Sequence, residues 1–266
     1  MAIAHTFAAE GAKVVIASRT AGELVRAAKA LAAGGAHVLP VACDVSREKD
    51  VARLVAATLK RFGRIDILVN NAGVLGPVGP VSTVDQDAWG RAVYINVVGT
   101  FLCTRAVLPS MLKRKQGTII NLSGGGAAAP RPNVSAYSAS KAAVVRFTET
   151  LAEELKGSNI QVNAIAPGAV HTRMTEELAR RGRLAGDKEL DEAVRTIETG
   201  GVSPYKAAEL ALFLASGRAG RLTGKLISAP WDDWKHFGKR AGPLSCSALY
   251  TLRRIDGRHF KEVRRC

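Results

Sequence analysis

The sequence predicts an α/β fold, a doubly wound parallel sheet with helices on both faces. Short apolar segments of strand type alternate with amphipathic helical segments along the chain. The segment at residues 14–17 is continuously apolar and the one at 65–69 is apolar except for Asp66, a pattern typical of strands buried on both faces. No internal repeat interrupts the alternation, so helices that cross over between parallel strands are the simplest interpretation.

Six segments are predicted as strands because they are short, apolar and bounded by turn residues. The third is followed by the turn Asn-Asn-Ala-Gly at residues 70–73, and the fourth by a glycine run at 124–126. The predicted strands are residues 14–17, 37–42, 65–69, 118–122, 160–165 and 225–228.

The segments between the strands are predicted as helices because their apolar residues recur at intervals of three and four. In residues 47–62, for example, Val51, Leu54, Val55 and Leu59 follow this spacing. The predicted helices are residues 1–10, 21–33, 47–62, 87–113, 136–155 and 204–215, with two polar helices between 173 and 199.

Composition excludes several classes of protein. With 47% hydrophobic and 23% charged residues, the chain has enough apolar material for a packed core and is not largely disordered. It lacks a run of about 18 apolar residues, so no membrane span is expected. The first residues contain no basic leader, so we expect no signal peptide. The cysteines form no C-x-x-C pair, which argues against a zinc or other metal site and a disulfide scaffold and favours a reducing cytoplasm. They are Cys43, Cys103, Cys246 and Cys266.

The formal net charge of +15 is unevenly distributed. Residues 235–266 contain nine Lys or Arg and two Asp or Glu, a net charge of +7. We therefore divide the chain into a domain at residues 1–234 and a basic, partly disordered C-terminal extension at 235–266. Basic tails can attract nucleic acid, but no nucleic-acid motif accompanies this one, so nucleic acid is not an expected partner.

Tyr137 and Lys141 lie four residues apart at the start of a predicted helix, in the sequence Tyr-Ser-Ala-Ser-Lys. Residues at this spacing share one helical face, so the phenol and the ammonium point into the same space. A neighbouring cation favours the phenolate and lowers the pKa of tyrosine, which would let Tyr137 exchange a proton near neutral pH. The alternative is an ordinary surface pair.

Other polar residues follow the ends of the predicted strands. The turn at residues 70–73 and Ser123 both come directly after a strand, and Pro167-Gly168 ends another. Asn96 lies within a predicted helix, where an amide is unfavourable without a partner. The carboxyl ends of parallel strands form the ligand-binding edge of such sheets, so these residues are predicted to converge there.

This set of motifs resembles the classical short-chain dehydrogenase/reductase (SDR) family over about residues 1–230. It consists of Asn-Asn-Ala-Gly at 70–73, Asn96, Ser123, Tyr137, Lys141 and Pro-Gly-x-Val-x-Thr at 167–172. The resemblance implies a Rossmann-like fold, here with its first strand missing, and an oxidoreductase that interconverts a carbonyl and a secondary alcohol. It also implies a small-molecule substrate and a homo-oligomer, a dimer or tetramer.

The resemblance implies four catalytic roles. Tyr137 would be the general acid in reduction and the base in oxidation. Lys141 would lower the pKa of Tyr137 and hold the nicotinamide ribose. Ser123 would orient the substrate carbonyl. Asn96 would fix a water that links Lys141 to solvent.

The resemblance also assigns cofactor contacts. The adenine side would be Asp44 and Val45, the ribose and pyrophosphate side Asn70, Ala72 and Gly73, and the nicotinamide side Pro167, Gly168, Val170 and Thr172.

Cofactor choice depends on the end of the strand at residues 14–17, which continues into Ser18 and Arg19. Enzymes that bind NAD carry an acidic residue at this position to hold the ribose 2′-hydroxyl. Here no carboxylate repels a 2′-phosphate, and Arg19 could pair with one. We therefore predict NADP(H) in preference to NAD(H). The alternative is that Arg19 is a solvated charge at the start of a helix.

Three departures from the family pattern matter. The opening strand and its glycine-rich phosphate loop are absent, which would leave a slot between the strands at residues 14–17 and 65–69. We therefore expect the domain at residues 1–234 to be N-terminally truncated, and a catalytically impaired binding or interaction protein is the alternative function. Ser123 precedes Tyr137 by 14 residues, one more than is usual in the family, and Gly124 occupies the usual place. A Gly-Gly pair after the last strand is replaced by a segment with Trp231 and Trp234, which we expect to close a core or a subunit contact.

Overall fold

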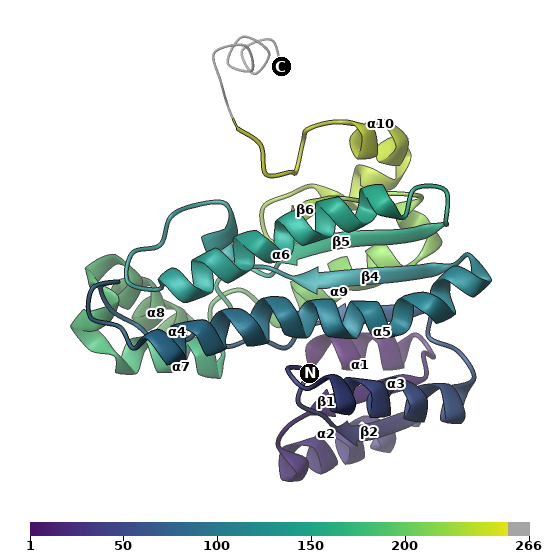
Figure 1. Ribbon diagram of the computed structural model, residues 1–266, viewed down its shortest axis with the longest axis horizontal. Coiled ribbons are helices and arrows are strands. Elements are labelled where there is room, and N and C mark those ends of the chain that lie inside the picture. Colours follow the sequence, from purple (N-terminus) through teal and green to yellow (C-terminus); the bar gives the residue numbers. More distant parts are fainter. Residues whose placement is uncertain (255–266) are drawn as a thin grey trace.

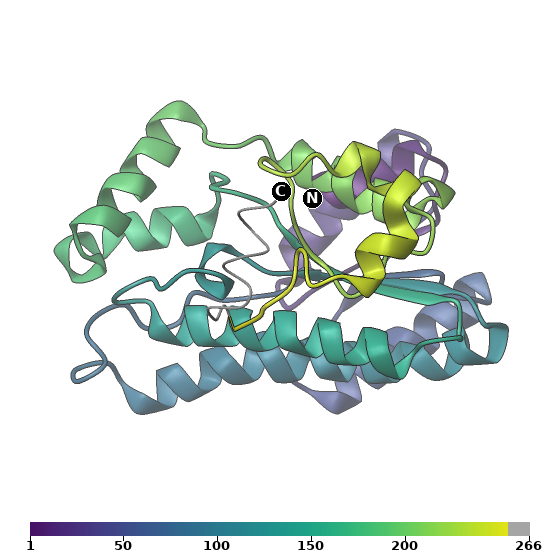
Figure 2. The same ribbon diagram turned by 90° about the horizontal axis from the view of Figure 1, so that it is seen from above.

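Apolar strand segments occupy the middle of the structure, and helices cover them on both sides (Figures 1 and 2). The computed structural model describes residues 1–254. The strands are β1 (Val14–Ser18), β2 (Val38–Ala42), β3 (Ile67–Asn70), β4 (Gly117–Leu122), β5 (Ile160–Ala166) and β6 (Leu226–Ser228). All of their pairings are parallel, which confirms the predicted α/β class.

The predicted helices are confirmed within a few residues, whereas α10 was not predicted. A π-helical turn at Tyr94–Val98 joins α4 to α5, so the predicted long helix is one continuous helical segment. The helices are α1 (Ala2–Ala9), α2 (Ala21–Ala33), α3 (Glu48–Phe62), α4 (Gln86–Val93), α5 (Gly99–Arg114), α6 (Ser135–Glu154), α7 (Arg173–Arg180), α8 (Asp187–Thr199), α9 (Pro204–Ala215) and α10 (Ala241–Cys246).

The sheet is divided into two parts. β1 pairs with β2 alone, and β3, β4, β5 and β6 form a separate four-stranded sheet in that order. Within residues 1–254, β1 and β3 therefore each have a single strand neighbour. Ile67, Leu68 and Val69 of β3 stay partly exposed, whereas all six residues of β4 are buried. The division lies where the sequence placed the empty slot.

Helix packing holds the two parts together. Phe7 of α1 and Val14 of β1 share one apolar cluster with Ile120, Leu122 and Ile165 of the larger sheet. Helix α1 also packs along α9, which covers β4 and β5 (Figure 1). Burial of side chains between these helices and the sheet replaces the strand pairing that is absent at the gap.

The two faces of the sheet carry different helices. Figure 2 shows α4, α5 and α6 on one side, with α1, α9 and the C-terminal segment on the other, while α7 and α8 extend beyond the sheet. The continuous helical segment at residues 86–114 is long and apolar enough to cross a membrane by length and composition. Its inner face packs on β3, β4 and α6, as a core helix of an α/β fold does.

The prediction that the domain ends at residue 234 is wrong. Trp234, Phe237, Ala241 and Leu244 are buried in the main apolar cluster, so residues 235–254 belong to the fold. Residues 255–266 of the predicted extension lie outside the described residues. Of the two tryptophans that were expected to close a core or a subunit contact, Trp234 is buried in the core, whereas Trp231 is 83% exposed.

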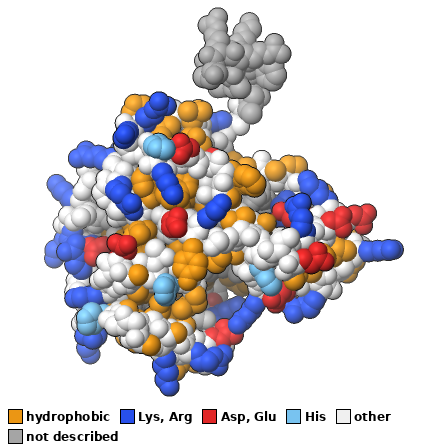
Figure 3. Space-filling view, turned by 180° about the vertical axis from the view of Figure 1, so that it is seen from behind, with side chains coloured by type: hydrophobic (Ala, Val, Ile, Leu, Met, Phe, Trp, Pro, Cys, Tyr) orange, Lys and Arg blue, Asp and Glu red, His pale blue; other side chains and the backbone are white. Residues whose placement is uncertain are grey.

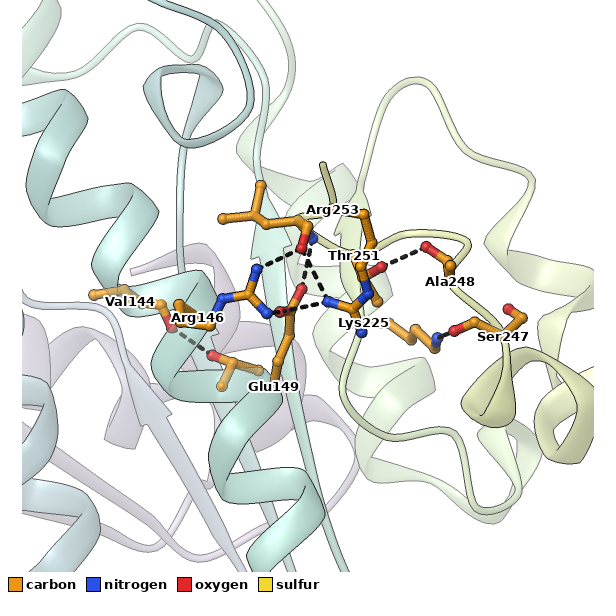
Figure 4. A network of polar contacts seen from close by, with 10 residues as sticks. Val144, Arg146, Glu149, Lys225, Ser247, Ala248, Thr251 and Arg253 are labelled. Carbon is orange, nitrogen blue, oxygen red and sulfur yellow. Dashed lines mark hydrogen bonds and ion pairs between the residues drawn. The ribbon is translucent and has the colours of Figure 1, made fainter. Parts of the chain in front are cut away.

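Glu149 and Lys225 anchor the C-terminal segment, as Figure 4 shows. Glu149 on α6 accepts a hydrogen bond from the Leu252 amide at 2.6 Å and pairs with Arg253 at 3.2 Å. The buried Lys225 Nζ donates to the carbonyl oxygens of Ser247 at 2.8 Å and Leu249 at 3.1 Å. Arg253, one of the positive charges of this segment, is therefore paired with Glu149 within the fold.

The divided sheet predicts uneven protection from hydrogen exchange. We expect the amides of β3 to exchange faster than those of β4, because β3 is bonded on one edge only and about half of its amides point away from β4. Native-state hydrogen exchange measures this, with β5 as a control that should be as slow as β4. Equal protection of β3 and β4 would contradict an open edge.

Candidate active site

Tyr137 and Lys141 occupy successive turns at the start of α6, on one face of the helix. The Lys141 Nζ lies 5.7 Å from the centroid of the Tyr137 ring. Both side chains are buried, with Tyr137 8% and Lys141 5% exposed. The structure therefore brings together the two residues that their spacing predicted to share one space.

The ammonium of Lys141 lies at the carboxyl end of the sheet. Its Nζ donates a hydrogen bond of 2.8 Å to the carbonyl oxygen of Leu122, the last residue of β4. Burial lowers the pKa of Lys141 to about 8, because the charged form loses its hydration. Among the described residues Leu122 supplies the one acceptor for three N–H donors, so two are left for a ligand.

The pKa of Tyr137 differs from the sequence expectation. Burial raises the pKa of the phenol, and the positive charge of Arg131 opposes this effect. We expected Lys141 to lower the pKa of Tyr137, but in this structure the loss of hydration outweighs any neighbouring charge. Near neutral pH the phenol is therefore protonated and can donate its proton.

Asn96 lies in the π-helical turn between α4 and α5, and hydrogen bonds satisfy its amide. Its Oδ1 accepts from the Val74 amide at 2.8 Å, and its Nδ2 donates to the Val74 carbonyl at 2.9 Å and to Ser140 Oγ at 2.8 Å. A β-carbon on Gly73 would lie 3.3 Å from both Asn96 Oδ1 and Lys141 Nζ. Gly73, Asn96 and Lys141 therefore converge at one point.

Ser123 does not share a hydrogen bond with Tyr137 in the described structure. Its Oγ instead donates to the Lys141 carbonyl at 3.5 Å. Gly124 faces the phenol, because a β-carbon built on it would overlap Tyr137 Oη. The extra residue between Ser123 and Tyr137 was the sequence signal for this difference. The expected role of Ser123 in orienting the substrate carbonyl stays a prediction.

The residues at the end of β3, where the ribose and pyrophosphate contacts are predicted, differ in their exposure. Asn71 and Ala72 follow β3 at the surface, and both are exposed. Asn70 is turned inward, and its Nδ2 donates to Asn121 Oδ1 at 2.8 Å and to Thr104 Oγ1 at 3.1 Å. The Asn70 side-chain amide therefore connects β3, β4 and α5 inside the core, and a contact of this residue with the cofactor stays a prediction.

Ser18, Arg19, Asp44 and Val45 lie beyond the gap, at the carboxyl ends of β1 and β2. Ser46 donates a hydrogen bond of 2.6 Å to Asp44 Oδ1, which is the main reason that the pKa of Asp44 is lowered. The positive charge of Arg19 lowers this pKa further. Ser18 Oγ accepts from the Thr20 amide at 3.2 Å. Val45 packs against Gly99, where a β-carbon would lie 2.9 Å from Val45 Cγ2.

The loop at residues 167–172 leads from β5 to α7. Gly168 has a φ of 84°, and a β-carbon there would lie 2.9 Å from Pro230 Cγ, so the position requires glycine. Val170 forms an isolated antiparallel bridge with Gly201. Thr172 is the N-cap of α7, and its Oγ1 accepts from the Thr175 amide at 3.4 Å. The loop that contains Pro167 thus carries the chain from the sheet edge to α7.

A pocket of about 700 Å³ opens beside this site. It lies between the loop after β3 and α7, and Arg19 is at its rim. Leu75 and Val78 line it and also belong to the apolar cluster that packs around Tyr137. Two residues of the pocket wall therefore also pack around the phenol.

Other features of the described residues bear on partners. No group of three His, Cys, Asp or Glu side chains within residues 1–254 could hold a metal ion. Figure 3 shows Lys and Arg side chains spread over the visible face rather than gathered in one patch. This distribution gives no focused surface for nucleic acid on that face.

Comparisons with known proteins agree with this geometry. The sequence profile described as "short chain dehydrogenase" matches residues 1–182. The 3-oxoacyl-[acyl-carrier-protein] reductase of Thermotoga maritima is 36% identical over 225 residues, which is 83% of this chain and 87% of that protein. Dehydrogenase/reductase SDR family member 4 of Homo sapiens is 36% identical over 228 residues, 85% of this chain and 80% of that protein.

Solved structures show the same relationship. A crystal structure of a variant of actinorhodin polyketide ketoreductase with NADPH has a TM-score of 0.79 and 30% identity, covering 92% of each chain. NAD⁺-bound xylitol dehydrogenase also has a TM-score of 0.79, with 28% identity, covering 85% of this chain and 91% of that one. The chain belongs to the short-chain dehydrogenase family. It is an oxidoreductase of the kind that acts on CH–OH groups.

The contact between Gly124 and the phenol predicts the effect of a small substitution. We expect Gly124→Ala to lower kcat by about 10²-fold, because its β-carbon would displace Tyr137 Oη from its position. Steady-state kinetics with a test ketone measures this. Gly125→Ala is the matched control, because nothing lies within 4 Å of its β-carbon. Equal activity of the two variants would contradict the proposed contact.

Proposed function

We propose that this protein interconverts a carbonyl and a secondary alcohol by hydride transfer, with Tyr137 as the acid and base. The observation that carries the proposal is the buried pair of Tyr137 and Lys141 at the carboxyl end of β4. Several relatives support the chemistry, since their names describe reductases and dehydrogenases.

The residues at this end of the sheet fit a nicotinamide ribose. Lys141 keeps two N–H donors for ribose hydroxyls, and the absence of a side chain at Gly73 leaves space beside its Nζ. When bound, the nicotinamide supplies the hydride. Pro167, Gly168, Val170 and Thr172 lie on the loop that follows β5 and would border the nicotinamide.

In the reducing direction, the Tyr137 hydroxyl donates its proton to the substrate oxygen as negative charge develops there. Burial favours the protonated phenol before this step, and the Lys141 ammonium stabilises the phenolate after it. Asn96 holds Val74 and Ser140 in place and so fixes the surroundings of Lys141. In the oxidising direction, the phenolate accepts the proton of the alcohol.

We propose NADP(H) as the preferred cofactor. β1 ends at Ser18 and continues into Arg19, with no carboxylate at this position to repel a 2′-phosphate. Arg19 has no ion-pair partner among residues 1–254, and it borders the pocket beside the active site. Asp44 is near enough for its pKa to respond to Arg19, but hydrogen bonds from Ser46 already engage its carboxylate.

We also propose a homo-oligomer, a dimer or tetramer formed through the long helices. Tyr94, Phe101 and Leu112 of the segment at residues 86–114 are 49%, 44% and 44% exposed, which is a large apolar exposure for one helical segment. Sedimentation equilibrium tests this, and a purely monomeric chain would contradict it.

A cytoplasmic location is a further proposal, supported by the free thiols of Cys43, Cys103 and Cys246.

The alternative function is a catalytically impaired binding or interaction protein. The assembled Tyr137 and Lys141 pair gives no support to that alternative.

Replacement of the phenol tests the proposed function. We expect Tyr137→Phe to lower the rate of NADPH-dependent ketone reduction by at least about 10²-fold, because the variant has no proton to donate. NADPH oxidation is followed by absorbance, and cofactor binding by fluorescence titration. Tyr205→Phe, an exposed phenol on α9, is the matched control. Undiminished turnover in Tyr137→Phe would refute the proposed acid, and no NADPH binding by the wild type would favour the alternative.

Replacement of Arg19 tests the choice of cofactor. We expect Arg19→Ala to raise the KM for NADPH about tenfold more than the KM for NADH, a loss of about 1.4 kcal/mol. Arg26→Ala removes an exposed charge from α2 and should leave the ratio of the two KM values unchanged. An unchanged ratio in Arg19→Ala would show that this residue does not select the cofactor.

A further inference from the structure

Arg131 lies beside the active-site phenol, in the loop between β4 and α6. Its guanidinium carbon is 5.8 Å from the centroid of the Tyr137 ring. Its side chain is 24% exposed, which is low for an arginine in a surface loop. The motifs of the sequence gave no role to this residue, because it lies six positions before Tyr137 and outside each of them.

Glu189 on α8 holds the guanidinium of Arg131. Arg131 Nε lies 3.0 Å from both carboxylate oxygens, and Nη2 also donates to Glu189 Oε2. The Glu189 side chain is 4% exposed. A hydrogen-bonded ion pair that excludes water fixes both partners, and loss of one partner leaves the other charge buried and unpaired.

The same loop has further contacts with the elements around the site. Asn133 Nδ2 donates to the Ala185 carbonyl at 3.3 Å, and its own carbonyl accepts from the Gly79 amide at 2.8 Å. Ser135 Oγ accepts from Trp89 Nε1 at 3.0 Å. The loop therefore connects the segment before α8, the loop after β3 and α4 to the first turn of α6, where Tyr137 lies.

We propose that Arg131 is a positioning residue for the reaction at Tyr137, which holds α8 against the active site through Glu189 and keeps a cation beside the phenol. This proposal rests on the proposed acid and base role of Tyr137. The charged groups beside the phenol are Lys141 on its own helix and Arg131 in the preceding loop, and Glu189 and Glu192 on α8 act on Arg131. Their balance decides how readily the phenolate forms.

The ion pair makes the two partners act on Tyr137 in opposite directions. Arg131 favours the phenolate, so its loss raises the pKa of Tyr137. Glu189 offsets the charge of Arg131, so neutralising Glu189 strengthens the field of the cation at the phenol and lowers the pKa of Tyr137. A contact that only supported the fold would not separate the two variants by direction.

The test compares the pH dependence of kcat/KM for alcohol oxidation. This value rises with pH as the phenolate forms, and the rising part of the profile is its pH limb. We expect Arg131→Gln to move this limb upward by about 0.5–1 pH unit, and Glu189→Gln to move it downward. Arg131→Lys retains the positive charge without the two-pronged contact, so it should keep the limb near the wild-type position while raising the substrate KM.

A second, exposed ion pair provides the control. Arg173 Nη2 lies 2.6 Å from Glu23 Oε1 and ties α7 to α2, and neither charge is among those that act on the pKa of Tyr137. Arg173→Gln should therefore leave the pH limb in place. Circular dichroism establishes that each variant is folded, and if Arg131→Gln does not fold, Glu189→Gln and Arg131→Lys still decide the question.

The proposal is overturned if Arg131→Gln and Glu189→Gln shift the limb in the same direction, or if neither shifts it. Loss of oxidation in Tyr137→Phe is measured separately and tests the proposed function itself. An active Tyr137→Phe enzyme thus rejects the acid and base role, whereas an inactive one with unmoved limbs in the other variants rejects the role of Arg131 alone.

Discussion

The Lys141 ammonium is buried against the last carbonyl of β4, and the active site depends on this contact. Burial of an unpaired ammonium is unfavourable, as the lowered pKa of about 8 reflects. The hydrogen bond to Leu122 offsets part of that cost and fixes α6 along the edge of the sheet. Because Tyr137 lies one turn before Lys141, the same contact sets the position of the phenol. Asn96 then joins the loop after β3 to α6 through Ser140.

The division of the sheet separates the proposed catalytic residues from some of the residues predicted to contact the cofactor. Tyr137, Lys141 and Asn96 belong to the four-stranded sheet and its helices, where strand pairing is continuous. Arg19 and Asp44 follow the two strands on the other side of the gap. The packing of α1 on α9 and a shared apolar cluster therefore control how the adenine side is placed relative to the reacting groups. Residues around the phenol are held more firmly, by paired strands and by the buried Arg131–Glu189 ion pair.

Several site features followed from spacing alone, and others did not. The four-residue interval between Tyr137 and Lys141 was sufficient, because helical geometry places such residues on one face. Asn96 was identified because an amide within a helix requires partners. The sequence did not reveal that the Ser123 hydroxyl faces the α6 backbone or that Gly124 lies against the phenol. Periodicity carries no information about which loop atom faces a neighbouring helix.

The sequence by itself determined the α/β class, the parallel order of elements and the pairing of Tyr137 with Lys141, because these depend on local periodicity and fixed intervals. Only the tertiary structure decided that residues 235–254 pack into the core, that Asn70 turns inward and that Arg131 reaches Glu189. Each of these depends on contacts between segments far apart in the chain, whose formation is decided by the burial of charge and apolar surface in the complete fold.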